Sequence, residues 1–459
     1  MKIWNAKLNH LCGMLILFGI TNFLSGCNTT SSTSPVTTPQ LSVSTEPSPS
    51  AIAIGVGSTL GFTIPRTSIP AGIGTITVTL NSTNPGSVTI PTTCTITYAS
   101  WVVVGGSCSS VTAIGAKAGT TTILATAPSF ASAITTAITT VSVTYAYVSD
   151  SSPNLWQCAM TENGTIVNNI CTPLENNNGG FNSTNCADFE SFDQPYIYVC
   201  DVNTAIPVLW QCPMTESGII GNNSRCNGLS GGFGPVAGTT FATFNDQRYA
   251  YVSDQSANLW QCSMTATGTI GNNSQCTRLV NSSSGGFAAT YGVTFASFAD
   301  TTYAYVSDNE SNVMWQCPMT ANGAIASGGC NGLLNSNTTI NATGFNPYIG
   351  GITFESFAGV TYAYVSDNAN VWRCQMTANG TIANNGYCDA LVDSNGYILA
   401  PVAVTFESFA GTNYAYVSED TGGQVIQCPL TESGAFADGG CNAFSPGFNY
   451  IAGITFYTP

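Results

Sequence analysis

Charge and histidine are both scarce in this 459-residue sequence. Only 7% of the residues are charged, and the single histidine, His10, lies in a short hydrophobic leader. Once the leader is removed, the chain cannot build Ser-His-Asp or Cys-His nucleophilic sites, or any metal site that needs histidine. Acid–base chemistry is then left to carboxylates, tyrosines and a few basic residues. The composition therefore favours a non-enzymatic role.

Basic residues are much rarer than acidic ones. Of the eight Lys and Arg, Lys2 and Lys7 lie in the leader, which leaves six basic residues against 23 acidic residues. Nucleic-acid binding depends on basic side chains that neutralise phosphates. We therefore expect no nucleic-acid partner.

The first 26 residues have the pattern of a targeting segment. The two lysines precede the apolar run Leu11–Ile20, which is too short to span a bilayer. Leu24–Cys27 resembles the lipobox of bacterial lipoproteins, which implies cleavage before Cys27 and lipidation of its side chain. An ordinary signal peptide with an incidental cysteine is the alternative.

The lipobox resemblance implies a location in the bacterial cell envelope. Several acyl chains on Cys27 would anchor the protein stably to a membrane. Asn28 follows the cysteine, where an aspartate would retain a lipoprotein in the inner membrane, and in a Gram-negative cell this favours the outer membrane. We expect the protein to face the periplasm or the cell surface. Residues 27–40, rich in Ser, Thr and Pro, would form an extended tether.

Residues 41–144 are predicted to form an Ig-like β-sandwich. Ala51–Ile64 alternates as a strand does. Asn84–Ile90 and Val111–Ala127 resemble the bacterial Ig-like group 2 pattern, in which a Gly-Thr turn precedes an I-x-A-T-A strand. The resemblance implies a spacer module.

Residues 145–459 contain a sixfold repeat. Y-A-Y-V-S-D or a variant begins at Tyr145, Tyr196, Tyr249, Tyr303, Tyr362 and Tyr414, and the W-Q-C segments that follow are spaced 50 to 57 residues apart. Within one copy, Ile352–Phe357, Tyr362–Ser366 and Val371–Met376 have strand periodicity, and Thr381–Cys388 is a weaker fourth candidate. Four antiparallel strands repeated radially make a propeller blade, so we predict an all-β, six-bladed β-propeller.

The two ends of the repeat are complementary. The repeat starts at Tyr145 on a second strand, and Ile451–Pro459 is a first strand with nothing after it. The C-terminal strand is therefore predicted to complete the first blade and close the ring, which removes an exposed sheet edge.

The segment G-[IV]-T-F-x-S-F-x-G-x-x-Y-A-Y-V-S-D resembles the YVTN and NHL propeller repeats, including the lactonase-like group. That group implies a divalent metal held in the central channel by Glu, Asn and Asp. The acidic residues on the predicted innermost strands are Glu190, Glu355 and Glu407. A metal-assisted, lactonase-like hydrolase is therefore the alternative function.

The cysteines outside the leader and the lipobox number sixteen. Their spacing of 13 to 14 residues, without C-x-x-C or histidine, favours disulfides over a metal site. Disulfides imply an oxidising compartment. The predicted pairs are Cys94–Cys108, Cys158–Cys171, Cys186–Cys200, Cys212–Cys226, Cys262–Cys276, Cys317–Cys330, Cys374–Cys388 and Cys428–Cys441.

An acidic residue ends each tyrosine strand. A ring of such carboxylates could hold Ca²⁺, or each could cap its own turn. Repetition in every copy favours the turn, and no cofactor is required. The tryptophans of the W-Q-C segments could stack on carbohydrate or pack between blades, and we favour packing. The aspartates in question are Asp150, Asp201, Asp254, Asp308 and Asp367.

The most variable segments lie between the fourth strand of one copy and the first strand of the next. Recognition usually resides in such loops on a rigid frame. We therefore expect a lipid-anchored, monomeric binding protein with an unknown protein or glycan partner, and a structural subunit of an envelope assembly is a further alternative. The loops are 175–184, 228–238, 280–291, 333–349 and 391–401.

Overall fold

The structure is a computed structural model that describes residues 38–458. Short segments are excluded from the description: 54–56, 101, 117–118, 142–143, 203–207, 216, 271–275, 282–285, 337–344 and 347. The predicted leader, the lipidation site Cys27 and most of the predicted tether lie outside the described residues. In the part of the chain that is described, no helix is long and apolar enough to cross a membrane.

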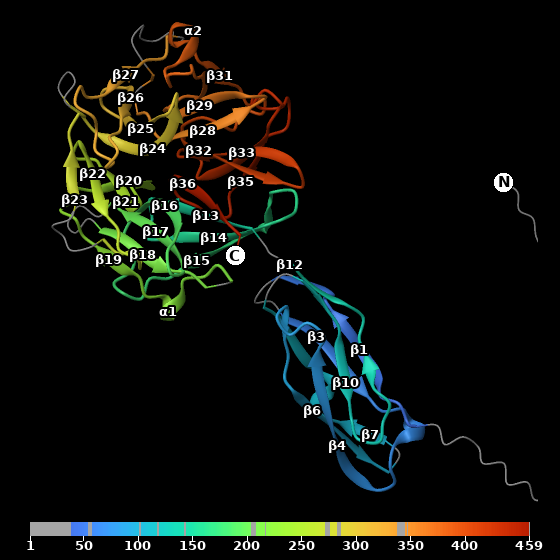
Figure 1. Ribbon diagram of the computed structural model, residues 1–459. Helices are drawn as coiled ribbons and strands as arrows, with labels where there is room; N and C mark the ends of the chain where they lie inside the picture. The colour runs from blue at the N-terminus through green and yellow to red at the C-terminus, as the bar shows by residue number, and fades with distance from the viewer. Residues whose placement is uncertain are drawn as a thin grey trace, which may run out of the picture.

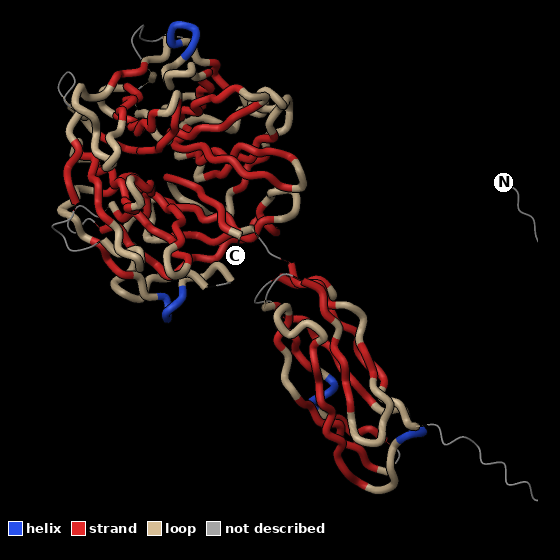
Figure 2. Tube along the Cα trace, in the orientation of Figure 1, coloured by secondary structure: helices blue, strands red, loops and turns tan. Residues whose placement is uncertain are grey.

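The N-terminal module is built almost wholly of β-strands (Figures 1 and 2). Its two larger sheets pack around one core that includes Leu60, Val78, Ile96 and Ile123, all at most 2% exposed. Alternation of apolar and polar residues explains these elements, because each strand turns one face toward the core. The two larger sheets have the strand orders β1 (Ser42–Ser48), β3 (Gly57–Thr63), β8 (Val111–Gly115), β5 (Val88–Thr89) and β11 (Ala133–Ile134), β10 (Ile123–Thr126), β4 (Ile73–Ser82), β6 (Thr93–Ala99), β7 (Val102–Gly105). The third sheet has the order β2 (Ala51–Ala53), β12 (Ile138–Val141), β9 (Gly119–Thr121). Single 3₁₀ turns lie at Arg66–Ser68 and Ser107–Ser109.

The repeat forms six four-stranded antiparallel sheets, numbered here from the one containing β13. The first sheet is β15 (Ile166–Leu174), β14 (Leu155–Met160), β13 (Tyr145–Asp150), β36 (Ile451–Tyr457), and the second is β16 (Thr184–Ser191), β17 (Pro195–Asp201), β18 (Val208–Pro213), β19 (Asn227–Leu229). The third sheet is β20 (Val236–Phe244), β21 (Gln247–Asp254), β22 (Asn258–Ser263), β23 (Cys276–Leu279), and the fourth is β24 (Thr290–Phe298), β25 (Thr301–Asp308), β26 (Val313–Pro318), β27 (Asn331–Leu333). The fifth sheet is β28 (Ile352–Phe357), β29 (Val360–Ser366), β30 (Val371–Gln375), β31 (Asp389–Leu391), and the sixth is β32 (Pro401–Phe409), β33 (Thr412–Glu419), β34 (Gln424–Pro429), β35 (Asn442–Phe444). Single helical turns lie at α1 (Gly221–Ser224) and α2 (Ala383–Gly386).

The sheets are arranged radially, as in a β-propeller (Figure 1). The first strands β36, β16, β20, β24, β28 and β32 contact one another in that order, and β32 contacts β36. The prediction of an all-β, propeller-like fold is confirmed. The expected fourth strand at Thr381–Cys388 is wrong in position: it forms at Asp389–Leu391, while Ile382 makes only an isolated bridge to Met376.

The C-terminal strand completes the first sheet. β36 pairs antiparallel with β13, so that Tyr457 lies opposite Tyr145 and Gly453 lies opposite Ser149. Every one of the six sheets thereby has four strands, and β13 has a partner on both sides. The two ends of the repeat are joined by backbone hydrogen bonds within a single sheet.

One contact is repeated between all neighbouring sheets. The Tyr305 hydroxyl, fully buried, donates to the carbonyl oxygen of Gly380 in the next sheet at 2.8 Å, and the Gln316 amide donates to the Tyr305 oxygen at 3.3 Å. Gly380 has φ +72°, and a Cβ there would lie 2.3 Å from the tyrosine oxygen, so the position requires glycine. The equivalent pairs are Tyr147–Gly218, Tyr198–Gly268, Tyr251–Gly323, Tyr364–Gly434 and Tyr416–Gly164, the last of which returns from the sixth sheet to the first.

The described residues contain eight disulfides. Cys94–Cys108 lies in the N-terminal module, and Cys186–Cys200 joins directly paired residues of β16 and β17. The other six join the third strand of each sheet to the segment at its fourth strand, with Cα–Cα distances of 4.0–4.3 Å. This many disulfides indicates an extracellular or periplasmic protein. The six are Cys158–Cys171, Cys212–Cys226, Cys262–Cys276, Cys317–Cys330, Cys374–Cys388 and Cys428–Cys441.

Candidate functional site

The repeated acidic residues hold the chain's own loops. Asp254 is fully buried and accepts hydrogen bonds from the Trp260 indole at 2.8 Å, the Gly234 amide at 2.9 Å and the Ser256 amide at 3.0 Å. Each carboxylate thus ties a strand end to a tryptophan and to the loop that enters the same sheet. The other tryptophan–carboxylate contacts are Trp156–Asp150, Trp210–Asp201, Trp315–Asp308 and Trp372–Asp367.

Asp308 illustrates the electrostatics of these turns. Burial raises the pKa of its carboxyl group, but hydrogen bonds from the Ala288 and Ala289 amides and the Trp315 indole outweigh burial and hold the pKa below its ordinary value. These hydrogen bonds stabilise the charged form of the carboxyl group. The predicted capping role therefore accounts for these residues, and their carboxylates do not gather: the described residues contain no group of three or more His, Cys, Asp or Glu placed to hold a metal ion.

The three innermost-strand glutamates do not converge either. Glu190 forms an ion pair with Arg248 of the neighbouring sheet. Glu355 and Glu407 line one small pocket at the end of the ring where the first strand of each sheet turns into the second. Each carboxylate accepts a hydrogen bond from the backbone amide of the serine that follows it, at 3.2 and 3.3 Å. The structure thus brings two of the predicted metal ligands together and leaves Glu190 with an arginine.

Asp188 is an acidic residue that the sequence did not single out. It lies opposite Tyr198 on β16, at the position that the other five first strands fill with threonine. Burial, with the nearby negative charge of Glu190, raises the pKa of Asp188 to about 7, although the Phe189 amide and Arg248 act in the opposite direction. Alignment of the six copies could have revealed it as the one carboxylate among threonines.

Replacing Asp188 with threonine is expected to stabilise the protein at neutral pH. Because the folded state holds the proton more tightly than the unfolded chain, wild-type stability falls as pH rises from about 4 to about 7. Each unit of pKa difference between the folded and unfolded states corresponds to about 1.4 kcal/mol of stability, and partial solvent contact lowers the total. We therefore expect the substitution to raise the free energy of unfolding by about 2 kcal/mol at pH 8 and to change it little at pH 4. Thermal melts of wild type, Asp188→Thr and Asp188→Asn from pH 4 to 8 test this. Parallel stability curves for all three would contradict it.

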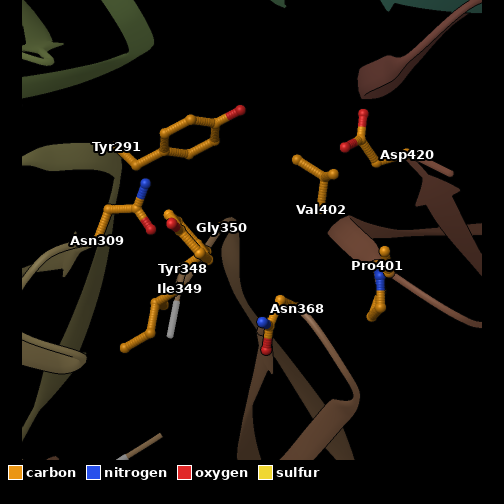
Figure 3. A pocket seen from close by; sticks show the side chains of 10 residues that line it. Tyr291, Asn309, Tyr348, Ile349, Gly350, Asn368, Pro401, Val402 and Asp420 are labelled. Carbon is orange, nitrogen blue, oxygen red and sulfur yellow. The ribbon is translucent and has the colours of Figure 1, made fainter. Parts of the chain in front are cut away.

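A pocket of about 240 Å³ opens on the face where the aspartates end the second strands (Figure 3). Its walls come from the fourth, fifth and sixth sheets: Tyr291 is the second residue of β24, Tyr348–Gly350 precede β28, and Pro401 and Val402 begin β32. Asn309, Asn368 and Asp420 each follow the acidic residue that ends a second strand. Three sheets therefore contribute side chains to this site, which we call the mouth pocket.

Tyr291 separates the mouth pocket from the channel. It lines both the mouth pocket and a second cavity of about 160 Å³, which we call the channel. All six sheets contribute to the channel wall, which includes the small residues Gly238, Ala403 and Gly453. Its hydroxyl reaches back to the second sheet and donates to the Asn185 side-chain oxygen at 3.4 Å. The five other sheets place Asn185, Ala237, Gly350, Val402 and Ala452 at the corresponding strand start.

The mouth pocket is acidic and polar on one side. Burial and the adjacent charge of Glu419 raise the pKa of Asp420, and burial raises the pKa of Tyr291. The Asn309 side-chain oxygen is buried and has no hydrogen-bond partner among the described residues. Figure 3 shows the Tyr291 ring extending toward the side that carries Asp420. None of the ten described lining residues is basic.

The sequence predicted part of this site. The variable loops 280–291, 333–349 and 391–401 supply Tyr291, Tyr348 and Ala400–Pro401. It missed Asn309 and Asn368, because they follow the repeated aspartate and look like turn residues. Their signal was variation at one fixed position: Ser151, Val202, Gln255, Asn309, Asn368 and Asp420 occupy it in turn.

No protein-family model and no curated protein matches the sequence. Solved structures similar to this chain include a periplasmic gluconolactonase from Pseudomonas aeruginosa, at 11% identity over 69% of this chain and 100% of that chain, with a TM-score of 0.45. A putative 6-phosphogluconolactonase from Bacteroides uniformis has 11% identity over 69% and 99%, with a TM-score of 0.42. A protein of unknown function from Bacteroides thetaiotaomicron has 9% identity over 86% and 96%, with a TM-score of 0.33. Similarity at this level carries no argument about activity.

Proposed function

We propose that this chain is an exported, lipid-anchored binding protein of the bacterial cell envelope. In this proposal Cys27 carries the anchor, an Ig-like sandwich serves as a spacer, and a six-bladed propeller presents the mouth pocket to a ligand. The protein acts as a monomer, without a cofactor, and its partner is a glycan or a protein of the envelope.

The observation that carries this proposal is the contrast between two sets of polar side chains on the same face. Asp254 and its equivalents are fully buried and bound to their own turns, so they have a structural role. Asn309, Asn368 and Asp420 lie one residue further along and line a pocket. Polar side chains that line a recess on a rigid frame are typical of recognition sites.

The test compares the two ends of the channel. Purified, fluorescently labelled full chain is applied to envelope preparations, alongside the mouth variant Tyr348→Ala/Asp420→Asn and the far-end variant Glu355→Gln. We expect the mouth variant to bind about tenfold or more weakly, because residues at the centre of a binding site carry most of the binding energy. The far-end variant should bind like wild type.

Equal binding by all three proteins would contradict recognition through the mouth pocket. Metal-dependent turnover of a lactone panel that is lost in Glu355→Gln would replace the proposal with a hydrolase. Matching thermal melts for the three proteins serve as the control for folding.

A further inference from the structure

The size of the mouth pocket limits its ligand to a small group. Its volume of about 240 Å³ lies below the range of roughly 300–1,000 Å³ that is typical of sites for drug-sized molecules. One six-membered ring with its substituents is of a suitable size, and an extended ligand would have to continue outside the pocket.

The charges around the pocket exclude an anionic ligand. Asp420 lines the pocket and Glu419 precedes it in the chain, while none of the lining residues that the structure describes is basic. Two arginines of the ring are engaged elsewhere, because Arg248 pairs with Glu190 and Arg373 pairs with Asp389. A phosphate or carboxylate would therefore meet a like charge without a partner.

The polar groups of the pocket suit hydroxyl groups. Asp420 offers carboxylate oxygens that accept hydrogen bonds, while Asn309 and Asn368 each offer both a donor and an acceptor. The Asn309 side-chain oxygen is buried and has no partner in the described part of the chain, and a buried acceptor of this kind is stabilised when a ligand donates to it. Because a hydroxyl group both donates and accepts, a ring bearing several hydroxyls can satisfy all three residues.

The apolar side of the pocket suits the flat face of a ring. Tyr348 is 64% exposed on the rim, and Ile349, Pro401 and Val402 complete this side. An aromatic ring left in water at a pocket rim provides a surface against which an amphipathic ring can pack. The pocket therefore combines an aromatic platform with a cluster of hydroxyl-binding groups.

We infer that the mouth pocket binds one uncharged, hydroxyl-rich sugar ring, with Asp420, Asn309 and Asn368 binding its hydroxyls and Tyr348 packing against its face. This inference rests on the proposed function and narrows the ligand class to neutral glycans. The sugar occupies the mouth, and Tyr291 forms the floor of the site above the channel.

Isothermal titration calorimetry on the purified full chain tests the inference, with methyl glycosides of neutral hexoses, a hexosamine, a hexuronic acid and a hexose phosphate as probes. We expect at least one neutral glycoside to bind with one-to-one stoichiometry and the anionic sugars to bind at least about tenfold more weakly. Asp420→Asn and Asn368→Ala should each weaken binding about tenfold, because each removes a hydroxyl partner. Tyr348→Ala should weaken it and Tyr348→Phe should not.

The matched controls are Glu355→Gln and Asn413→Ala, which line the pocket at the opposite end of the ring and should bind like wild type. Stronger binding of the hexosamine or of an anionic sugar than of every neutral glycoside would overturn the inference, as would the absence of sugar binding. If sugar binding is absent while envelope binding still depends on the mouth residues, the proposed function stands and the partner is a protein. If neither depends on the mouth residues, both are wrong.

Discussion

Deletion of Ile451–Pro459 is expected to unfold the ring or to leave it partly open. β36 supplies the first strand of the first sheet, and Ile451 and Ile454 are buried in it. Phe456 packs on Tyr416 of the sixth sheet at 4.6 Å between ring centroids. Burying a side chain of this kind is worth about 1.5–3 kcal/mol, so the loss of three is comparable with the whole stability of a domain, about 5–15 kcal/mol.

Thermal unfolding followed by circular dichroism, together with limited proteolysis, measures the effect of this deletion. We expect the cooperative transition of the ring to disappear or to shift down by more than about 10 °C. Deletion of Thr458 and Pro459 alone, which leaves β36 intact, is the matched control. Adding the nine-residue peptide back should restore part of the transition. Identical melting of the truncated and complete chains would show that ring closure contributes little.

Reduction of the disulfides is expected to have the second-largest effect. The six repeated bridges join cysteines 13 or 14 residues apart, and each loop of this length is worth about 3 kcal/mol in the chain-entropy model. Both cysteines of Cys212–Cys226 and of Cys374–Cys388 are at most 2% exposed, so reductant reaches these bridges only when the sheets open. A reduced chain should therefore melt far below the oxidised one.

The measurement is a thermal melt before and after reduction under denaturing conditions and refolding in reductant, with thiol titration to confirm complete reduction. The double substitution Cys212→Ala/Cys226→Ala removes one bridge and should lower the free energy of unfolding by about 2–5 kcal/mol. This value measures the contribution of one bridge. A fully reduced protein that melts at the oxidised temperature would contradict a stabilising role for the bridges.

Much of the ring could be predicted from the sequence because its instructions are local and repeated. Tyr305, Gln316 and Gly380 each recur in every copy, with glutamine replaced only in the fifth, where Arg373 stands, and their strand periodicity needs no long-range information. The fourth strand was misplaced because Thr381 and Ile382 have strand-like character but follow a tight turn. Only three residues, starting after Cys388, reach the neighbouring strand.

The mouth pocket could not be assembled from the sequence in the same way. Its residues come from three consecutive copies and are spread over more than 100 positions, from Tyr291 to Asp420, and each looks ordinary within its own copy. Tyr291 stands out as a site residue only when the starts of the first strands of all six sheets are compared. Asp420 stands out only when the residues that face it from the neighbouring sheets are known. The repeated carboxylates behave in the opposite way, because their contacts lie within one sheet: residues such as Asp254 hold the turn and loop of their own copy, the role that repetition favoured over a Ca²⁺ ring.

The pairing of β36 with β13 also determines how the ring would carry a mechanical load. The chain enters the ring at Tyr145, while the other end of β13, at Asp150, lies on the face of the mouth pocket, where the amide of Ser151 binds the carbonyl of Tyr450. A pull on the chain before Tyr145, resisted by a ligand at the mouth, therefore runs along β13. Because hydrogen bonds between strands lie perpendicular to them, those to β14 and β36 would be loaded together in shear instead of breaking one after another.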